Sequence, residues 1–245
     1  MRKNINDVDI NYIRYGNTDG EDVVLLHGWG QNIEMMKPIG NALSKEFNVT
    51  IIDLPGHGES SEPPFPWHVS DYVNAVKKLL EKLKIDNPIL IGHSFGGKIS
   101  LLYASMYKTK KLVLFGSPFK KEIQKLSMKT KILKSLKKVP VLNKLEGFAK
   151  KHIGSTDYRN ASDTMRKVLV NTVNLDITEE VKKINAPTLI IWGTHDEAVP
   201  LEHAYELETL IKDAGVVVYE NCTHYAYLEN LNQTINVLYS FLGGK

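Results

Sequence analysis

Short apolar runs alternate along this chain with segments whose apolar residues recur every three or four positions. The short runs are VDINYIRY, VVLLHG, NVTIIDL, PILIGHS, KLVLFGS, PTLIIWG and GVVVYENC. The segments with helical spacing cover residues 33–45, 70–84, 95–107, 201–213 and 227–242. Strands that alternate with crossover helices predict an α/β fold, a mostly parallel twisted sheet with helices on both faces. Near the start, NINDVDI predicts a hairpin turn and an antiparallel first strand.

One long stretch interrupts this alternation. Between FGSP at residues 115–118 and NAPTLIIWG at residues 185–193 the sequence is rich in lysine and helical in pattern, with no convincing strand. So long a connection is uncommon as a structureless loop in a compact domain. We therefore expect an α/β core formed by residues 1–117 and 185–245, and an inserted helical cap, or lid, formed by residues 118–184.

Composition narrows the class of protein. A chain of 245 residues with 42% hydrophobic residues fits one large α/β domain. The single cysteine, Cys222, excludes an internal disulfide framework and is expected to be a small buried residue. No apolar run has the length of a signal peptide or a membrane span, so we expect a cytoplasmic protein without stable membrane insertion. The formal net charge of +3 is too small to indicate nucleic-acid binding.

Candidate chemistry begins at residues 92–96, where GHSFG places Ser94 between two glycines. The apolar strand PILIG runs directly into this motif, and the helix-compatible segment GGKISLLYASMY follows it. Ser94 is therefore predicted on a sharp strand-to-helix turn, at positive φ, where larger neighbours would collide with the turn. Such a turn presents the hydroxyl as a nucleophile at the carboxyl edge of the sheet. The alternative is a serine that only caps the following helix.

A serine nucleophile needs a base to take its proton and an acid to orient that base. Asp196, in THDEAVP, follows the strand PTLIIWG, and His224, in NCTHYAYLENL, follows the next strand. Both are predicted at the sheet edge that carries Ser94, in the chain order Ser94, Asp196, His224. Glu197 is the competing acid.

Other histidines compete with His224 for the role of base. His195 would point away from its neighbour in an extended loop, and His203 lies in a predicted helix. His57 and His93 are expected to make structural hydrogen bonds or to line the pocket.

Several motifs stand in a characteristic order. They are HGWG at 27–30, DLPGHGES at 53–60, GHSFGG at 92–97 and GTHDEAVP at 193–200, followed by His224. With these motifs the sequence resembles the α/β-hydrolase superfamily over nearly its whole length. The resemblance implies a capped serine hydrolase with Ser94 as nucleophile, Asp196 as orienting acid and His224 as general base. The family's Gly-x-x-Asp pattern after this strand also favours Asp196 over Glu197.

The oxyanion of such a reaction needs two convergent backbone N–H donors. Phe95, directly after the nucleophile, is expected to supply one donor, and Trp29, in HGWG, the other. Gly28 would let the backbone approach closely. The expected substrate-binding residues are Gly28, Trp29, His93 and Phe95, and ordinary core packing is the alternative role for Trp29. No metal or organic cofactor is expected.

The expected activity is hydrolysis of a carboxylic ester through an acyl-enzyme on Ser94. A serine here, in place of aspartate, disfavours the chemistry of the related haloalkane dehalogenases and epoxide hydrolases. Related folds also perform carbon–carbon bond hydrolysis, perhydrolysis, lactone opening, peptide cleavage and an elimination in menaquinone synthesis, and the sequence does not separate these. An alternative of another class is a ligand receptor that turns over slowly.

The predicted cap is strongly basic. Between Lys120 and Lys167, twelve lysines and two arginines stand against four acidic residues, and residues 120–142 have the pattern of an amphipathic helix. This charge is typical either of a solvated lid face or of a site for an anionic partner, such as a phosphopantetheine carrier protein, a coenzyme A thioester or a membrane surface. LLHGWGQN and IIDLPGHGES are also similar to the pimeloyl-carrier-protein methyl ester esterases of biotin synthesis. The expected partner is therefore a small acyl ester, free or linked to a carrier protein or coenzyme A.

Overall fold

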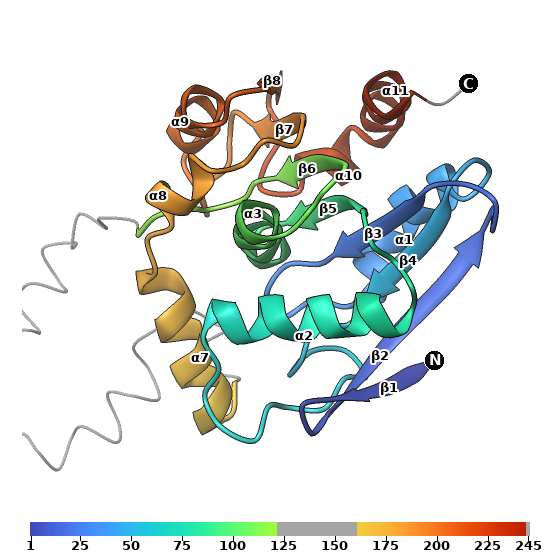
Figure 1. The fold of residues 1–245 in the computed structure, drawn as a ribbon. Helices are drawn as coiled ribbons and strands as arrows, with labels where there is room; N and C mark the ends of the chain where they lie inside the picture. The colour runs from blue at the N-terminus through green and yellow to red at the C-terminus, as the bar shows by residue number, and fades with distance from the viewer. Residues whose placement is uncertain (122–160, 244–245) are drawn as a thin grey trace, which may run out of the picture.

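A computed structural model describes residues 1–121 and 161–243, which form one eight-stranded sheet with helices on both faces (Figure 1). The strands are β1 (Arg2–Ile5), β2 (Val8–Gly16), β3 (Asp22–Leu26), β4 (Asn48–Ile52), β5 (Ile89–His93), β6 (Lys111–Phe115), β7 (Thr188–Gly193) and β8 (Ala214–Tyr219). Their order is β1-β2-β4-β3-β5-β6-β7-β8. β1 and β2 pair antiparallel, β2 is antiparallel to β4, and the remaining neighbours are parallel. The predicted α/β fold with an antiparallel start is confirmed.

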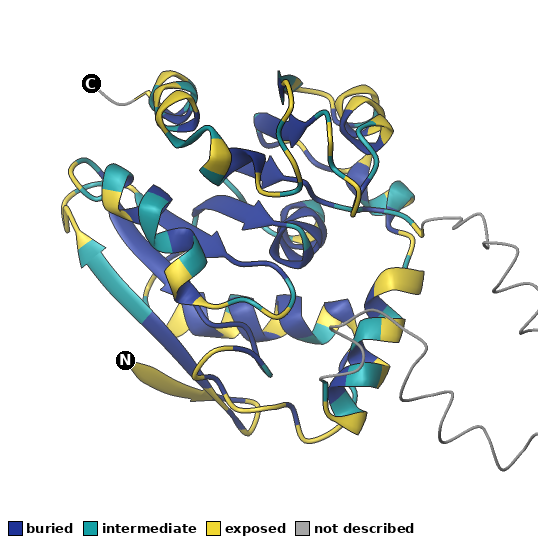
Figure 2. Ribbon diagram, turned by 180° about the vertical axis from the view of Figure 1, so that it is seen from behind, coloured by how far each residue is buried: buried dark blue, intermediate teal, exposed yellow. Residues whose placement is uncertain are grey.

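Alternate residues of the central strands face two separate hydrophobic cores. The helices are α1 (Ile33–Leu43), α2 (Val69–Lys82), α3 (Phe95–Met106), α7 (Asp163–Asn174), α8 (Thr178–Val181), α9 (Glu202–Leu210), α10 (Ala226–Glu229) and α11 (Leu231–Leu242). In β3, Val24 and Leu26 pack toward α2 and α3, whereas Val23 and Leu25 pack toward α1 and α11. Figure 2 shows the buried central strands and helices that expose only their outer faces. Burial on both sides explains why these strands are apolar at every position.

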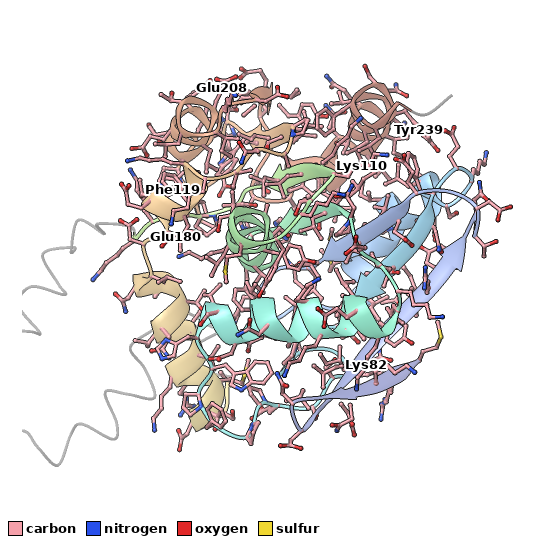
Figure 3. The ribbon with its side chains drawn as sticks, viewed as in Figure 1. Lys82, Lys110, Phe119, Glu180, Glu208 and Tyr239 are labelled. Atoms are coloured by element: carbon pink, nitrogen blue, oxygen red, sulfur yellow. The ribbon has the colours of Figure 1, made fainter. Side chains whose placement is uncertain are left out.

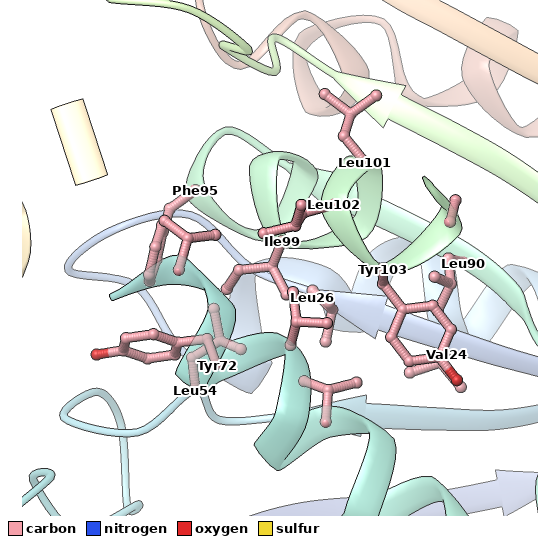
Figure 4. Close-up of a cluster of buried hydrophobic side chains, with 14 of the residues drawn as sticks. Val24, Leu26, Leu54, Tyr72, Leu90, Phe95, Ile99, Leu101, Leu102 and Tyr103 are labelled. Atoms are coloured by element: carbon pink, nitrogen blue, oxygen red, sulfur yellow. The ribbon is translucent and has the colours of Figure 1, made fainter. Parts of the chain in front are cut away.

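The core on the α2 and α3 side includes Phe95, the residue that follows Ser94 (Figure 4). Tyr72 of α2 and Phe95, at the start of α3, pack with ring centroids 5.0 Å apart. Leu26 and Leu90 extend this cluster from the sheet. Each fully buried side chain of this size contributes about 1.5–3 kcal/mol of hydrophobic free energy. The packing fixes the start of α3 against the carboxyl ends of β3 and β5.

The predicted elements match the observed ones closely, with differences at their ends. The hairpin turn forms at Asn6 and Asp7, both at positive φ. The predicted helix at 201–213 ends at Leu210, and the predicted helix at 227–242 divides at Asn230 into α10 and α11.

The described parts of the predicted cap, residues 118–121 and 161–184, pack on the core. Phe119 is fully buried and its carbonyl accepts the N–H of Ile177 at 2.9 Å. In Figure 3, Phe119 and Glu180 of α8 lie close to the point where the chain leaves the described structure. The lysine-rich helix predicted within 120–142 lies almost wholly outside the described residues. The division into core and cap therefore stays a prediction.

A buried lysine joins α3 to α7. Lys98 is 1% exposed, and its Nζ donates to the carbonyls of Thr172 at 2.8 Å and Leu175 at 2.6 Å. These carbonyls end α7, where a cation is favoured by the helix dipole. Desolvation nevertheless lowers the pKa of Lys98 to about 8. The contact fixes α7 relative to the helix that begins at Ser94.

In the described part of the chain, none of the helices combines the length and apolar character needed to cross a membrane.

Candidate active site

Ser94 lies on a strained turn between β5 and α3. Its φ is 50° and its ψ is −110°, and its N–H donates to the carbonyl of Phe115 at 2.9 Å. It occupies the N-cap position of α3, but its side chain makes no capping hydrogen bond. The predicted positive φ is confirmed, and helix capping does not explain the serine. Strain of this kind is typical of functional residues that the surrounding structure holds in place.

The glycines beside Ser94 are required by close backbone contacts. A Cβ on Gly92 would lie 2.6 Å from the carbonyl oxygen of Gly96, and a Cβ on Gly96 would lie 2.3 Å from that of Leu26. The N–H of Gly96 also donates to the carbonyl of His27 at 3.1 Å. The turn is therefore pressed against the end of β3, where the HGWG loop begins.

The acid and the base predicted from the sequence are in contact. Asp196 follows β7 and His224 follows β8, and Nδ1 of His224 lies 2.7 Å from Oδ2 of Asp196. The other carboxylate oxygen accepts the N–H groups of Ala198 at 2.9 Å and Val199 at 2.8 Å. The Asp196 side chain is 1% exposed and that of His224 is 14% exposed. An ionised carboxylate only accepts hydrogen bonds, so the imidazole hydrogen lies on Nδ1 and leaves the lone pair of Nε2 free.

Ser94 and His224 both lie beside the end of β6. Ser94 is bonded to Phe115, and a Cβ on the next residue, Gly116, would lie 2.9 Å from Nδ1 of His224. Gly116 also has φ of 51°, a conformation that favours glycine. Between the described residues, no hydrogen bond joins the Ser94 hydroxyl to His224. In enzymes without substrate such bonds are often long, and they tighten in the complex.

The competing candidates lie elsewhere. Glu197 and His195 are exposed, and His203 is buried in α9 with its ring 5.1 Å from that of Phe119. Cys222 is partly exposed, so the expectation that it would be buried is wrong. It lies in the loop after β8, is packed against the core on the α1 and α11 side, and its carbonyl accepts the N–H of His195 at 2.8 Å.

The peptide unit between Gly28 and Trp29 is held in one orientation. The carbonyl of Gly28 lies 2.7 Å from Nδ1 of His27, whose Nε2 accepts the N–H of Leu54 at 3.0 Å. The Leu54 donor requires a lone pair on Nε2, which places the hydrogen of His27 on Nδ1. Since the C=O and N–H of a trans peptide point in opposite directions, the Trp29 N–H is directed away from His27. Burial and the neighbouring His57 lower the pKa of His27 to about 4, so the ring is neutral at pH 7.

Both expected oxyanion donors remain available. Among the described residues, neither the Trp29 N–H nor the Phe95 N–H donates to another group. The two side chains also touch, with ring centroids 5.3 Å apart, and the Trp29 ring lies 4.8 Å from that of His57. Trp29 is partly exposed, whereas Phe95 and His57 are buried. Trp29 therefore packs over these buried rings, and its own ring forms a largely apolar surface beside Ser94.

His93 is fully buried beneath His224. Its Nε2 lies 3.1 Å from the His224 carbonyl, and its Nδ1 lies 3.2 Å from Oε1 of Gln31. Burial, together with the nearby His224, lowers the pKa of His93 to about 3. The ring offers no surface to a substrate in this structure, which favours the structural role over the expected substrate contact. Gly28 is likewise buried, and a Cβ there would lie 2.9 Å from Nδ1 of His93.

Several residues that shape the site were not predicted from the sequence, namely His27, Gln31, Gly116 and Tyr225. His27 and Gln31 stand within the quoted motif LLHGWGQN, but nothing in the sequence shows which side chains they meet. Within residues 1–121 and 161–243, no group of three or more His, Cys, Asp or Glu residues is placed to hold a metal ion.

A sharp turn that carries a serine follows β5, and the loops after β7 and β8 carry the acid and the histidine. This arrangement defines an α/β-hydrolase architecture. The chain belongs to this family, because the family model described as alpha/beta hydrolase fold matches residues 23–133 and 121–231. The chain is 28% identical to the pimeloyl-[acyl-carrier protein] methyl ester esterase of Pseudoalteromonas atlantica, over 86% of this chain and 90% of that protein. It is 27% identical to 2-hydroxy-6-oxononadienedioate/2-hydroxy-6-oxononatrienedioate hydrolase 1 of Pseudomonas putida, over 96% of this chain and 92% of that protein.

A solved structure agrees with the fold. The enol-lactonase from Burkholderia xenovorans superposes with a TM-score of 0.78 at 22% identity, covering 99% of this chain and 100% of that one. The family match and the curated relatives together make this chain a hydrolase of the α/β superfamily.

Proposed function

We propose that the chain is a serine hydrolase that cleaves carboxylic esters through an acyl-enzyme on Ser94. One observation carries the proposal: His224 Nδ1 lies 2.7 Å from Asp196 Oδ2 at the sheet edge that also holds the strained Ser94. This hydrogen bond fixes the tautomer in which Nε2 can accept a proton. No metal or organic cofactor takes part in the proposed reaction.

In the first half-reaction, the Ser94 hydroxyl attacks the ester carbonyl carbon while Nε2 of His224 takes its proton. The carbonyl oxygen becomes an oxyanion, which the N–H groups of Trp29 and Phe95 stabilise. Each such donor is typically worth about 3 kcal/mol. The C–O bond then breaks, and the alcohol leaves with the proton from His224.

In the second half-reaction, water replaces the alcohol. His224 takes a proton from the water as its oxygen attacks the acyl carbon, and the same two N–H groups hold the second oxyanion. The bond to Ser94 breaks, the serine regains its proton from His224, and the carboxylic acid is released. Asp196 stays ionised throughout and stabilises the imidazolium that forms in each half.

The proposed substrate is a small acyl ester with an apolar acyl group. The partly exposed ring of Trp29, which packs against the buried ring of Phe95, supports an apolar acyl part. The relative from Pseudoalteromonas atlantica is named for a methyl ester on a pimeloyl group carried by acyl-carrier protein. A carrier-linked ester is therefore the first physiological substrate class to test.

The test compares the wild-type protein with Ser94→Ala. We expect a fluorophosphonate probe to label only the wild type, and a chain-length series of p-nitrophenyl esters to be hydrolysed only by the wild type. Unchanged ester turnover in Ser94→Ala would refute the serine mechanism, and absence of labelling in both proteins would count against an assembled triad.

Carbon–carbon bond hydrolysis is the second candidate, because the Pseudomonas putida relative is named as a hydrolase of 2-hydroxy-6-oxo dienedioates. A protein that labels at Ser94 but leaves every ester intact would favour this activity, measured on a 2-hydroxy-6-oxo dienoate. Ligand-dependent capture of a protein partner with negligible multiple turnover would instead favour a receptor.

A further inference from the structure

Gln31 joins the loop that carries the proposed oxyanion donor to the loop that carries the proposed base. We propose that Gln31 is a positioning residue that holds the Trp29 N–H and His224 in fixed positions relative to each other in the active site. The proposal rests on the proposed function, since it assigns Gln31 a part in that reaction. It touches neither substrate nor reacting atoms.

The Gln31 side chain uses both ends of its amide. Oε1 accepts the N–H of Gly28 at 3.0 Å and lies 3.2 Å from Nδ1 of His93, while Nε2 donates to the hydroxyl of Tyr225 at 3.2 Å. The Gly28 N–H can only donate, so it determines which end of the amide is the oxygen. Gln31 thus bridges segments that lie 194 residues apart in the chain.

On one side, Gln31 holds Gly28 by both of its backbone groups. Its side chain takes the Gly28 N–H, and its own N–H donates to the Gly28 carbonyl at 3.3 Å. The engaged N–H of Gly28 is unavailable to an oxyanion. The next N–H along the chain, that of Trp29, donates to no other described group, and the two bonds between Gln31 and Gly28 help to hold its direction.

On the other side, Gln31 reaches the residue next to His224. Tyr225 receives the amide hydrogen, and His93, which touches Gln31 Oε1, lies 3.1 Å from the carbonyl of His224. The contacts are tight, since a Cβ on Gly28 would lie 3.1 Å from Oε1 of Gln31. A shift of the Gln31 amide therefore moves the donor loop and the base loop relative to each other.

Such a shift should affect the transition state more than substrate binding. The oxyanion forms only during the reaction, and misplacement of a catalytic group by about 1 Å can cost about 100-fold in rate. For Gln31→Met, which keeps the length but removes the amide, we expect kcat to fall by about 10- to 100-fold with KM nearly unchanged.

Gln31→Glu separates positioning from packing. Its carboxylate can still accept the Gly28 N–H, and the Tyr225 hydroxyl can donate to it, so we expect most of the lost kcat to return. Its negative charge near His93 and His224 favours their protonated forms, which should move the acid limb of the kcat/KM profile to higher pH. A residue that merely filled space would be replaced better by Met than by Glu.

The experiment measures kcat, KM and the pH profile of Gln31→Met, Gln31→Glu, Tyr225→Phe and the double variant Gln31→Met/Tyr225→Phe, with p-nitrophenyl esters. The control is Glu34→Gln, an exposed residue of α1 whose partner is Lys37. We expect the effects of Gln31→Met and Tyr225→Phe to be less than additive, because both remove one shared contact. A thermal melt of each variant checks the fold.

Unchanged kcat in Gln31→Met, or a loss that Gln31→Glu does not restore, overturns the proposal. Measurements on the wild-type protein distinguish this outcome from failure of the proposed function. Labelling of Ser94 and ester turnover in the wild type would leave the serine mechanism standing even where the bridge is refuted, whereas a wild type without either would refute both.

Discussion

Replacing Asp196 by asparagine should reverse the tautomer of His224. Oδ1 of Asp196 accepts two backbone N–H groups, from Ala198 and Val199, so the NH₂ group of an asparagine cannot sit there. Its carbonyl oxygen must keep that place, which puts the NH₂ group where Oδ2 now lies 2.7 Å from Nδ1 of His224. Nδ1 would then have to accept, and the hydrogen would move to Nε2.

A hydrogen on Nε2 removes the lone pair that takes the Ser94 proton. The corresponding exchange in a well-studied serine protease lowers kcat by about 10⁴-fold while leaving the geometry intact. We expect a loss of the same order here, which corresponds to about 5 kcal/mol of transition-state stabilisation. KM should change little, because neither residue needs to contact the bound ester before the attack.

The assay measures kcat and KM on a p-nitrophenyl ester, with a thermal melt as a check on the fold. The matched control is Glu197→Gln, the exposed neighbour that competes with Asp196 for the role of acid, and its kcat should be unchanged. If Asp196→Asn retained kcat within about tenfold, or if Glu197→Gln lost it instead, the tautomer argument would be refuted.

Two further predictions concern the pH dependence of stability and the steric effect of an added methyl group at Gly116. Between pH 8 and 10.5 the unfolded chain holds a proton on Lys98 that the folded chain, with a pKa of about 8, has lost, so the free energy of unfolding should rise with pH in this window. Urea unfolding at both ends of this pH window measures the free energy of unfolding. We expect it to rise by up to about 3 kcal/mol more in the wild type than in Lys98→Met. An equal pH dependence of this free energy in the two proteins would contradict the prediction. Gly116→Ala should destabilise the fold by about 1–2 kcal/mol and lower kcat, because φ is 51° and the new methyl group would lie 2.9 Å from Nδ1 of His224. Gly215→Ala, with no atom within 4 Å of the new carbon, is its control, and equal melts and equal kcat for the two variants would refute this reasoning.

The fold could be predicted from the sequence because each layer leaves a local signal. Strands buried on both faces are apolar at consecutive positions, and the crossover helices have apolar residues at three- and four-residue spacing. Lys98 illustrates what such signals miss. Within the helical pattern it counts as a polar residue, yet it is buried because the carbonyls of Thr172 and Leu175, more than 70 residues away, accept its hydrogens. A partner so distant in the chain leaves no local pattern.

The residues of the candidate site can likewise be divided into those that the sequence predicts and those that it does not. Ser94, Asp196 and His224 each follow a strand, so sheet topology alone predicts that they share an edge. The residues that orient them are placed by contacts between loops, as Gln31 is by Tyr225. Cys222 is only partly buried for a related reason, because residue type alone does not indicate how deeply a loop residue packs against the core.

The protonation of neighbouring histidines shows why burial matters for the proposed base. His27 and His93 each have a pKa that burial lowers, to about 4 and about 3, so both rings are neutral at pH 7. The ring of His93 lies 4.8 Å from that of His224, and a positive charge there would oppose the imidazolium that His224 forms in the proposed reaction. The carboxylate of Asp196 contacts the ring of His224, with Oδ2 2.7 Å from Nδ1. His224 therefore has a carboxylate in contact with its ring and an uncharged His93 beside it, an arrangement that supports its proposed role as the base.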